Sequence, residues 1–152
     1  MIKKKILITS INGPIAYELV KKLKNFFYVI GSDCQPNGLG KKICDEFYIS
    51  PKGEDKNFLK FLNKIEPKVN QIFLYADEEI YNLSKNRYLM EKVTKKTLLS
   101  PHKTIKICNN KSVLRNHLKK FINFPKNYNN KIIIKPRIGR GSKNQLILKD
   151  YN

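Results

Sequence analysis

The chain has 152 residues, of which 41% are hydrophobic, and a formal net charge of +19. This apolar fraction can build a packed core for one domain, or for one domain and part of another, and it excludes a disordered chain. No apolar run approaches the roughly 18 residues that a membrane-spanning helix needs, and the basic start at residues 1–5 lacks the apolar stretch of a signal peptide. We therefore expect a cytoplasmic protein without a membrane partner.

The positive charge is distributed in a way that argues against a specific reader of nucleic acids. Lysine supplies most of it, and arginine occurs only at Arg87, Arg115, Arg137 and Arg140. The lysines are spread along the whole chain, whereas nucleic-acid readers tend to concentrate arginine and interleave aromatic residues in one region. We interpret most lysines as solvated surface residues, and a basic nucleic-acid binder stays an alternative.

The cysteines and histidines form no recognisable site. Cys34, Cys44 and Cys108 are odd in number and widely spaced, which fits neither a disulfide framework nor a CxxC pair. His102 and His117 lack metal-ligand spacing. We expect reduced structural thiols and no metal site on these residues.

Strand-like and helix-like segments alternate over the first hundred residues. The segments expected to be strands are residues 4–10, 28–33, the end of 38–50, 71–77 and 96–100. The segments expected to be helices are residues 11–27, the start of 38–50, 54–67 and 78–93. This alternation with short connections predicts a Rossmann-like α/β fold with a doubly wound, mainly parallel sheet.

The inner faces of three helices follow from their apolar spacing. Asn12 is expected to cap the first helix, with Pro14 in its first turn and Pro67 ending the third. The residues expected on inner faces are Ile15, Leu19, Leu23 and Phe26 in the first helix, Phe58, Leu59, Leu62 and Ile65 in the next long one, and Ile80, Leu83, Tyr88 and Met90 in the last.

The pattern changes near residue 100. Residues 101–121 predict two helices, the second opening near Asn109 and Asn110, and a polar link with a proline follows at 123–130. Two strands around a glycine-containing turn at 131–148 predict an antiparallel hairpin. We infer a Rossmann-like domain over residues 1–108 and the beginning of a second domain over residues 109–152.

Polar residues follow the expected strands at the edge where parallel α/β sheets bind ligands. Ser10, Asn12 and Gly13 form the first loop, before a helix N-terminus that can hold an anion. Asp33 ends the second strand, where a dinucleotide-binding domain would carry an acid. The loop has one glycine and Pro14 in place of GxGxxG, so a tight turn is favoured over a dinucleotide site.

An acidic cluster, Asp77, Glu78 and Glu79, follows the fourth expected strand. The helix dipole alone favours carboxylates early in a helix. Capping is therefore the first interpretation, and binding of an amine or orientation of a substrate is the alternative.

The hairpin carries the strongest signal for phosphate binding. Lys135 adjoins an apolar run, and a desolvated lysine there would need an anionic partner. Glycines let a backbone approach phosphate closely, and basic or hydroxyl side chains add donors. The residues that supply these features are Arg137, Gly139, Arg140, Gly141, Ser142 and Lys143. The Walker A pattern is absent, and a solvated basic turn is the alternative.

Several motifs resemble a known family. The segment ICNNK at 107–111, followed by a helix, a proline link and IIIKPRIGRGS at 132–142, resembles the opening of an ATP-grasp domain. KILITSINGPIAYELVKKL, VIGSDCQPNGLGKKICDEFYISP and FLYADEEIYNLS resemble the pre-ATP-grasp domain that precedes it. The chain is similar over essentially its whole length to proteins like the large subunit of carbamoyl-phosphate synthase, including short forms that resemble the pyrrolysine-biosynthesis ligase.

The resemblance implies roles for individual residues. Lys111 matches a basic residue that reaches ATP phosphates, and Lys135 matches a strand lysine near the adenine and α-phosphate. The glycine-rich loop that closes over the outer phosphates matches Gly139, Arg140, Gly141 and Ser142. Asp77 and Glu79 match a DxE pattern that faces the active-site cleft.

The resemblance also implies a reaction. ATP activates a small-molecule carboxylate as an acyl phosphate, and an amine or another nucleophile displaces the phosphate. The family's Mg2+ ligands lie downstream of the matched region, so we expect them outside this chain, in a C-terminal ATP-grasp portion of the same or a second chain. We expect an N-terminal fragment, a truncated product or a split subunit that is inactive alone, with its catalytic residues unidentified and a homodimer open. The alternative is a non-catalytic Rossmann-like module that binds a nucleotide or nucleotide sugar.

Overall fold

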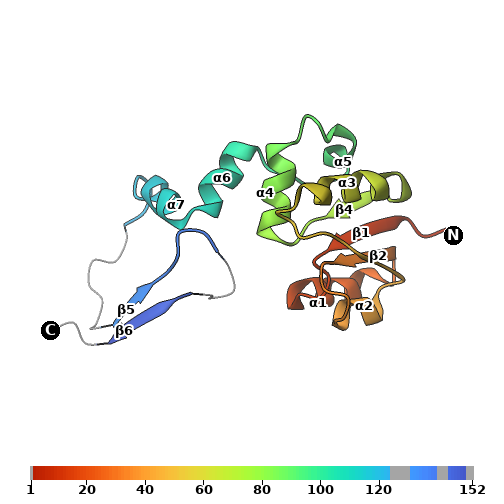
Figure 1. Ribbon diagram of the computed structural model, residues 1–152, viewed down its shortest axis with the longest axis horizontal. Helices are drawn as coiled ribbons and strands as arrows, with labels where there is room; N and C mark the ends of the chain where they lie inside the picture. The colour runs from red at the N-terminus through yellow and green to blue at the C-terminus, as the bar shows by residue number, and fades with distance from the viewer. Residues whose placement is uncertain (1, 124–130, 140–143, 150–152) are drawn as a thin grey trace. The chain divides into compact units, whose positions relative to one another are not determined.

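The computed structural model describes residues 2–123, 131–139 and 144–149. The chain divides into two compact units, Met1–His102 and Lys103–Asn152 (Figure 1). This division reflects packing, and the boundary between family domains that we expect after residue 108 stays a prediction. In the described part of the chain, no helix is long and apolar enough to cross a membrane.

A parallel sheet forms the centre of the first unit. Its strands are β1 (Lys5–Thr9), β2 (Tyr28–Asp33), β3 (Glu46–Ile49) and β4 (Gln71–Phe73), in the spatial order β3-β2-β1-β4. Leu7 of β1 lies opposite both Ile30 of β2 and Ile72 of β4. The predicted α/β fold with a parallel sheet is confirmed.

Helices cover both faces of this sheet (Figure 1). The helices of the unit are α1 (Pro14–Leu23), α2 (Leu39–Ile43), α3 (Lys56–Ile65), α4 (Asp77–Lys85) and α5 (Glu91–Lys95), with a 3-10 turn η1 (Glu66–Lys68) after α3. Helices α1 and α2 lie on one face, and α3, α4 and α5 lie on the other. Alternate strand residues point to opposite faces of the sheet, so the strands contribute side chains to two hydrophobic cores.

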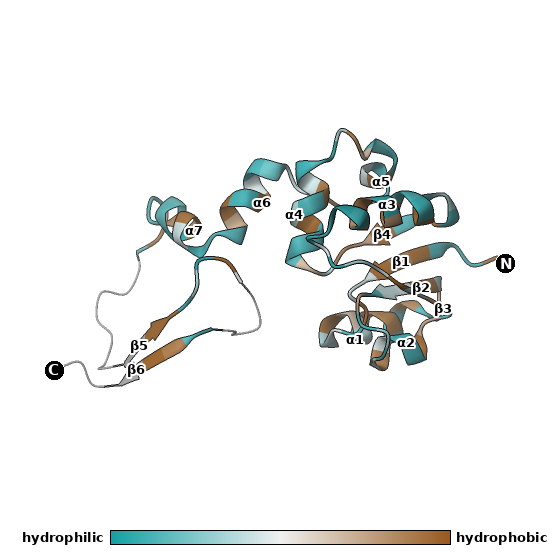
Figure 2. Cartoon of the chain, in the orientation of Figure 1, coloured by the Kyte–Doolittle hydropathy of each residue, from teal (hydrophilic) through white to brown (hydrophobic). Residues whose placement is uncertain are grey.

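The two cores follow from that alternation. Ile6, Ile8 and Val29 pack with Ala16 and Val20 of α1. On the opposite face the buried cluster consists of Leu7, Ile30, Phe58, Leu62, Ile65, Val69, Ile72, Leu83, Met90 and Val93. Figure 2 shows hydrophobic residues along these strands and on the helix surfaces turned toward them.

The first helix is rotated relative to the expected inner face. Its buried residues are Ala16 and Val20, while Ile15 and Phe26 are 73% and 71% exposed. Pro14 does occupy the first helical position, but the N-cap is Gly13, so Asn12 is not the cap. The helix ends at Leu23, which leaves Phe26 beyond it. The expected stripe was therefore wrong at both of its ends.

The segment 78–93 forms two helices, not the single helix expected. Asn86 leaves helical geometry (φ −108°, ψ 19°) at the end of α4, and its side-chain amide donates to the Asn82 carbonyl (2.8 Å). Leu83 and Met90 are buried as expected, whereas Tyr88 is 92% exposed between the helices. The strand expected at 96–100 is reduced to one bridge, between Thr97 and residue 72 of β4.

The α3 prediction is confirmed. Phe58, Leu62 and Ile65 are fully buried, and Leu59 packs partly against the same core. Asp55 caps the helix, since its side chain accepts a hydrogen bond from the Asn57 amide (2.7 Å).

The second unit contains the two helices and the antiparallel hairpin that the sequence predicts. These elements are α6 (His102–Asn109), which begins at the last residue of the first unit, α7 (Lys111–Leu118), β5 (Lys131–Ile134) and β6 (Leu146–Lys149). In the hairpin, Ile133 pairs with Ile147 and Ile134 pairs with Leu146. Ile133 and Ile134 are 54% and 46% exposed, and Lys135 is exposed too, so the buried surroundings expected for Lys135 are not present.

Candidate functional site

Asp33 ties two loops together at the carboxyl edge of the parallel sheet. It ends β2 and is 8% exposed. One carboxylate oxygen accepts a hydrogen bond from the Asn12 amide (3.0 Å), and the other accepts one from the Gln35 amide (2.9 Å). Both oxygens are thus bonded to the protein's own backbone, which is the arrangement of a loop anchor.

The Asn12 side chain joins the same loop to the start of α2. Its amide nitrogen donates to the Gln35 carbonyl (3.2 Å), and its oxygen accepts from the Lys41 amide (3.3 Å). Gly38 is required by this contact, because a Cβ there would lie 2.1 Å from Asn12 Cγ. The missing side chain lets the two loops pack directly against each other.

Ser10 gives the first loop its tight shape. Its φ of +48° lies in the left-handed region, which residues other than glycine rarely adopt. The Gly13 amide donates to the Ser10 carbonyl (3.1 Å) and closes the turn. The tight turn favoured from the sequence is what the structure contains, and such backbone strain is often found at functional sites.

Glu79 is the most buried acid of this edge, with 3% of its surface exposed. Its Oε2 accepts hydrogen bonds from Thr9 Oγ1 (2.5 Å) and the Ala76 amide (3.1 Å), and its Oε1 accepts one from Ser10 Oγ (3.0 Å). Burial raises the pKa of Glu79, and the hydrogen bonds from Thr9, Ala76 and Ser10 oppose that rise. The side chain therefore joins the end of β1 to the start of α4.

The acidic cluster divides between the interior and the surface. Glu79 points inward and bonds back to the amide that precedes its helix, as expected for capping, whereas Asp77 is exposed in the same first turn. Gly53 packs closely on this turn, and a Cβ at that position would lie only 2.7 Å from Glu79 Cγ. The Asn82 side-chain amide donates a hydrogen bond to the Gly53 carbonyl (2.8 Å). Three loops thus converge on Glu79.

Two buried hydroxyl residues of this edge were missed by the sequence analysis. Thr9 and Ser32 lie opposite each other on β1 and β2 and are both fully buried. The Thr9 hydroxyl donates a hydrogen bond to Glu79, while Ser32 Oγ has no hydrogen-bond partner among the described residues. The available signal was the appearance of small hydroxyl residues at the ends of two apolar strands.

In the second unit, three of the predicted nucleotide-binding residues come together. The Lys111 amide donates to the Arg137 carbonyl (2.9 Å), and Lys111 Nζ donates to the Gly139 carbonyl (2.6 Å). Gly139 has a φ of +136°, a conformation that favours glycine. Lys111 and Gly139 are 28 positions apart in the chain, so this bond joins the start of α7 to the turn after β5.

Of the other predicted nucleotide-binding residues, only Lys135 lies in the described part of the chain. Lys135 is exposed just after β5, and no hydrogen bond or ion pair joins it to another described residue. Arg140, Gly141 and Ser142 lie outside the described residues. Within the described part of the chain, no group of three His, Cys, Asp or Glu residues could hold a metal ion.

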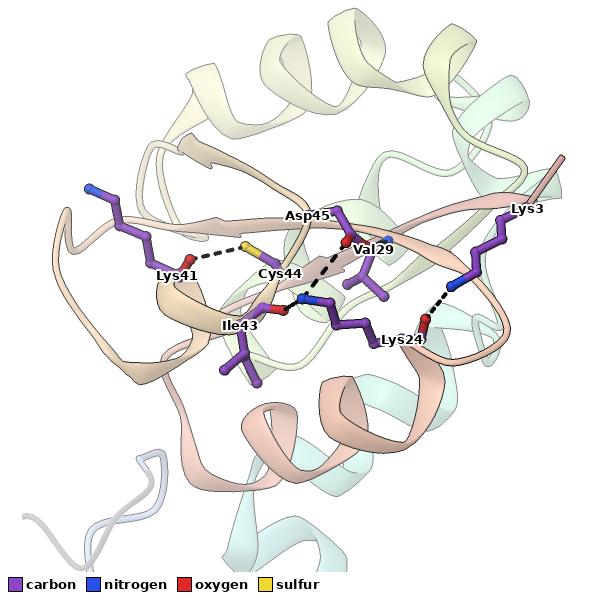
Figure 3. A network of polar contacts seen from close by, with 7 residues as sticks. All are labelled: Lys3, Lys24, Val29, Lys41, Ile43, Cys44 and Asp45. Atoms are coloured by element: carbon purple, nitrogen blue, oxygen red, sulfur yellow. Dashed lines mark hydrogen bonds and ion pairs between the residues drawn. The ribbon is translucent and has the colours of Figure 1, made fainter.

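A separate polar network lies near the start of β2 (Figure 3). Lys24 Nζ donates to the Ile43 carbonyl (2.8 Å) and lies 3.8 Å from Asp45, whose other oxygen accepts from the Val29 amide (2.8 Å). Lys3 Nζ donates to the Lys24 carbonyl (2.8 Å). These contacts hold the ends of α1 and α2 against the sheet, so the network has a structural role.

The cysteines Cys34, Cys44 and Cys108 are free, and the surroundings of two of them disfavour the thiolate form. Burial is the largest cause that raises the pKa of the Cys34 and Cys44 thiols, and the nearby Asp33 and Asp45 carboxylates add to it. Thiolate is the reactive form, so a raised pKa makes these two thiols less reactive at neutral pH.

No protein-family model matches the sequence, and no curated protein matches it. Solved structures do match. N5-carboxyaminoimidazole synthetase from Staphylococcus aureus complexed with ADP has a TM-score of 0.69 at 16% identity, over 98% of this chain and 42% of that one. N5-carboxyaminoimidazole ribonucleotide synthetase from Thermotoga maritima has a TM-score of 0.62 at 22% identity, over 97% and 41%. L-amino acid ligase from Bacillus licheniformis has a TM-score of 0.62 at 14% identity, over 99% and 40%.

These likenesses define the fold. The chain shares its α/β fold with part of each of these two synthetases and this ligase. At these identities the match concerns the fold alone, and the chain spans about two fifths of the length of each structure.

Proposed function

We propose that this chain contributes the N-terminal part of an ATP-dependent ligase that joins a small carboxylate to an amine or a related nucleophile. The observation that carries the proposal is the pair of hydrogen bonds from Lys111 to the turn at Arg137 and Gly139. They bring the two motifs of the sequence resemblance into one structure. The fold likeness supports the same class, since one of the matched structures is an L-amino acid ligase and another is a synthetase complexed with ADP.

The described residues of the second unit fit the phosphates of a nucleotide. Lys111, Lys135 and Arg137 are exposed residues, so phosphate oxygens can approach them without disturbing a core. Lys111 is bonded to a neutral carbonyl, and an anionic phosphate is a stronger acceptor for the same ammonium. Arg140, Gly141 and Ser142 are proposed to complete this nucleotide site.

Within this proposal ATP supplies the phosphoryl group that activates the carboxylate as an acyl phosphate. Positive side chains such as Lys111 and Lys135 stabilise charge on the phosphates and hold them in one orientation. Mg2+ would neutralise charge on the phosphates in the same reaction, and the residues that would hold it are proposed to lie outside this chain. The described residues therefore bind and orient the nucleotide.

The carboxyl edge of the parallel sheet is the proposed substrate side. Asp33 and Glu79 hold the Ser10–Gly13 loop in place there, and Asp77 carries an exposed carboxylate that suits an amine. Because Asp33 and Glu79 are bonded within the protein, we assign them the task of shaping the loop that contacts the substrate.

The finer assignment follows the sequence resemblance. We propose a cytoplasmic protein similar to the large subunit of carbamoyl-phosphate synthase or to the pyrrolysine-biosynthesis ligase. Its proposed partner is a C-terminal ATP-grasp portion, in the same or a second chain, and this chain alone is expected to show no ligase turnover. Self-association into a homodimer is compatible with this arrangement.

Calorimetric titration of the chain with ATP and, separately, with NAD tests the proposal. ATP binding without measurable NAD binding is the expected result. Tight binding of NAD and none of ATP would instead favour a dinucleotide-binding module. Amide formation coupled to ATP hydrolysis by the chain alone would contradict the need for a further portion.

A further inference from the structure

The start of α7 is set by the side chain of Asn110. Its Oδ1 accepts hydrogen bonds from the Ser112 amide (3.1 Å) and the Val113 amide (3.2 Å). These are two of the amides that the first turn of a helix leaves without an intrahelical acceptor. The cap therefore fixes the helix to begin at Lys111 and not a residue earlier or later.

The residue immediately after this cap makes both contacts with the turn after β5. The Lys111 amide donates to the Arg137 carbonyl, and its ammonium donates to the Gly139 carbonyl 2.6 Å away. Lys111 is exposed, so no packing around its side chain dictates where the ammonium lies. Its position depends on the backbone of the first turn, which Asn110 holds.

The rest of α7 gives this position little additional support. The helix has eight residues, and none of them is buried. Isolated helices of that length are marginal in water. A change at the cap is therefore expected to be felt at Lys111 and not to be absorbed by a rigid packed helix.

We propose that Asn110 is a positioning residue of the nucleotide site, which holds the Lys111 ammonium at the turn formed by Arg137 and Gly139. This inference rests on the proposed function, because it treats that turn as a nucleotide-binding element. Asn110 has no contact with the nucleotide in this proposal. It acts through Lys111 alone.

The test is a double-mutant cycle on the full chain, with ADP affinity measured by calorimetry for Asn110→Ala, Asn110→Ser, Lys111→Met and the Asn110→Ala/Lys111→Met double variant. Replacing a cap by alanine destabilises the start of a helix by about 1 kcal/mol. Because the proposal places this cost on the binding-competent position of Lys111, it corresponds to roughly fivefold in ADP affinity. Asn110→Ala should therefore bind ADP about fivefold more weakly, and Asn110→Ser, which keeps a capping oxygen, should bind like the wild type. In the Lys111→Met background, Asn110→Ala should have no further effect on affinity.

The outcomes separate this inference from the proposed function. Unchanged ADP affinity in Lys111→Met, or no ADP binding by the wild type, would overturn the proposed function and the inference with it. Weaker binding in Lys111→Met together with wild-type binding in Asn110→Ala would overturn the inference alone. Equal losses from Asn110→Ala in both backgrounds would also overturn it, because the effect would then not pass through Lys111. Amide hydrogen exchange at Ser112 and Val113 verifies that the cap, and not the whole chain, was disturbed.

Discussion

Replacing Glu79 by alanine should destabilise the first unit by about 2–3 kcal/mol. The carboxylate accepts three hydrogen bonds, and a buried bond of this kind contributes about 1 kcal/mol net, or more when the acceptor is charged. The loss is not the full sum, because Thr9 Oγ1 already lies 3.3 Å from the Phe73 carbonyl and can turn to it. Ser10 Oγ and the Ala76 amide lose their acceptor without such a replacement close by.

Urea unfolding of the Glu79→Ala variant measures this free energy. Asp77→Ala is the matched control, since Asp77 lies in the same helical turn but is exposed, and its loss should cost roughly 0.3–1 kcal/mol through the helix dipole. If Glu79→Ala unfolds within about 0.5 kcal/mol of the wild type, the three hydrogen bonds do not stabilise the loops and the reasoning fails.

Three further predictions concern residues of the same unit. The free energy of unfolding of the wild type should exceed that of Glu79→Gln most below about pH 4.3, the ordinary pKa of glutamate. This advantage should be lost as the pH rises through the pKa of Glu79 in the folded state, which burial raises. An advantage that grows with pH would contradict this prediction. Gly40→Ala should lower the unfolding temperature although alanine favours helices by about 1 kcal/mol, because its Cβ would lie 2.1 Å from the Ile11 carbonyl oxygen; a raised unfolding temperature would refute this. Cys34 should react with iodoacetamide at pH 7.5 more slowly than a model peptide thiol, and equal or faster modification by mass spectrometry would show that its pKa is not raised.

Most of the fold could be predicted from local sequence patterns. The strands of the sheet are short apolar runs, and α3 carries apolar residues at regular helical spacing, so both could be identified without tertiary information. The orientation of α1 could not, because Ile15 and Ala16 are both apolar and only the packing against the sheet decides which is buried. The break after α4 involves the side chain of Asn86, which donates a hydrogen bond to the backbone carbonyl of Asn82, four residues earlier, and apolar periodicity does not detect such a bond.

The sequence predicted the types of residue in the candidate site better than it predicted their contacts. Lys111 and Gly139 were predicted to serve the same nucleotide, and the structure brings them within hydrogen-bonding distance. The direction of Glu79 was not predictable, because it depends on Thr9 and Ser10, which are about 70 positions away in the chain. Hydrogen bonds between such distant segments follow from the strand order of the sheet and not from local patterns.

The affinity of the full chain for ATP, compared between Lys135→Met and Lys106→Met, tests the central claim most directly. Both variants remove one exposed lysine of the second unit, but only Lys135 belongs to the proposed nucleotide site. A lost hydrogen bond to a charged group costs about 1.5–3 kcal/mol, so Lys135→Met should bind ATP at least about tenfold more weakly, while Lys106→Met should bind like the wild type. Equal affinities in the two variants would contradict the claim that the end of β5 binds a nucleotide.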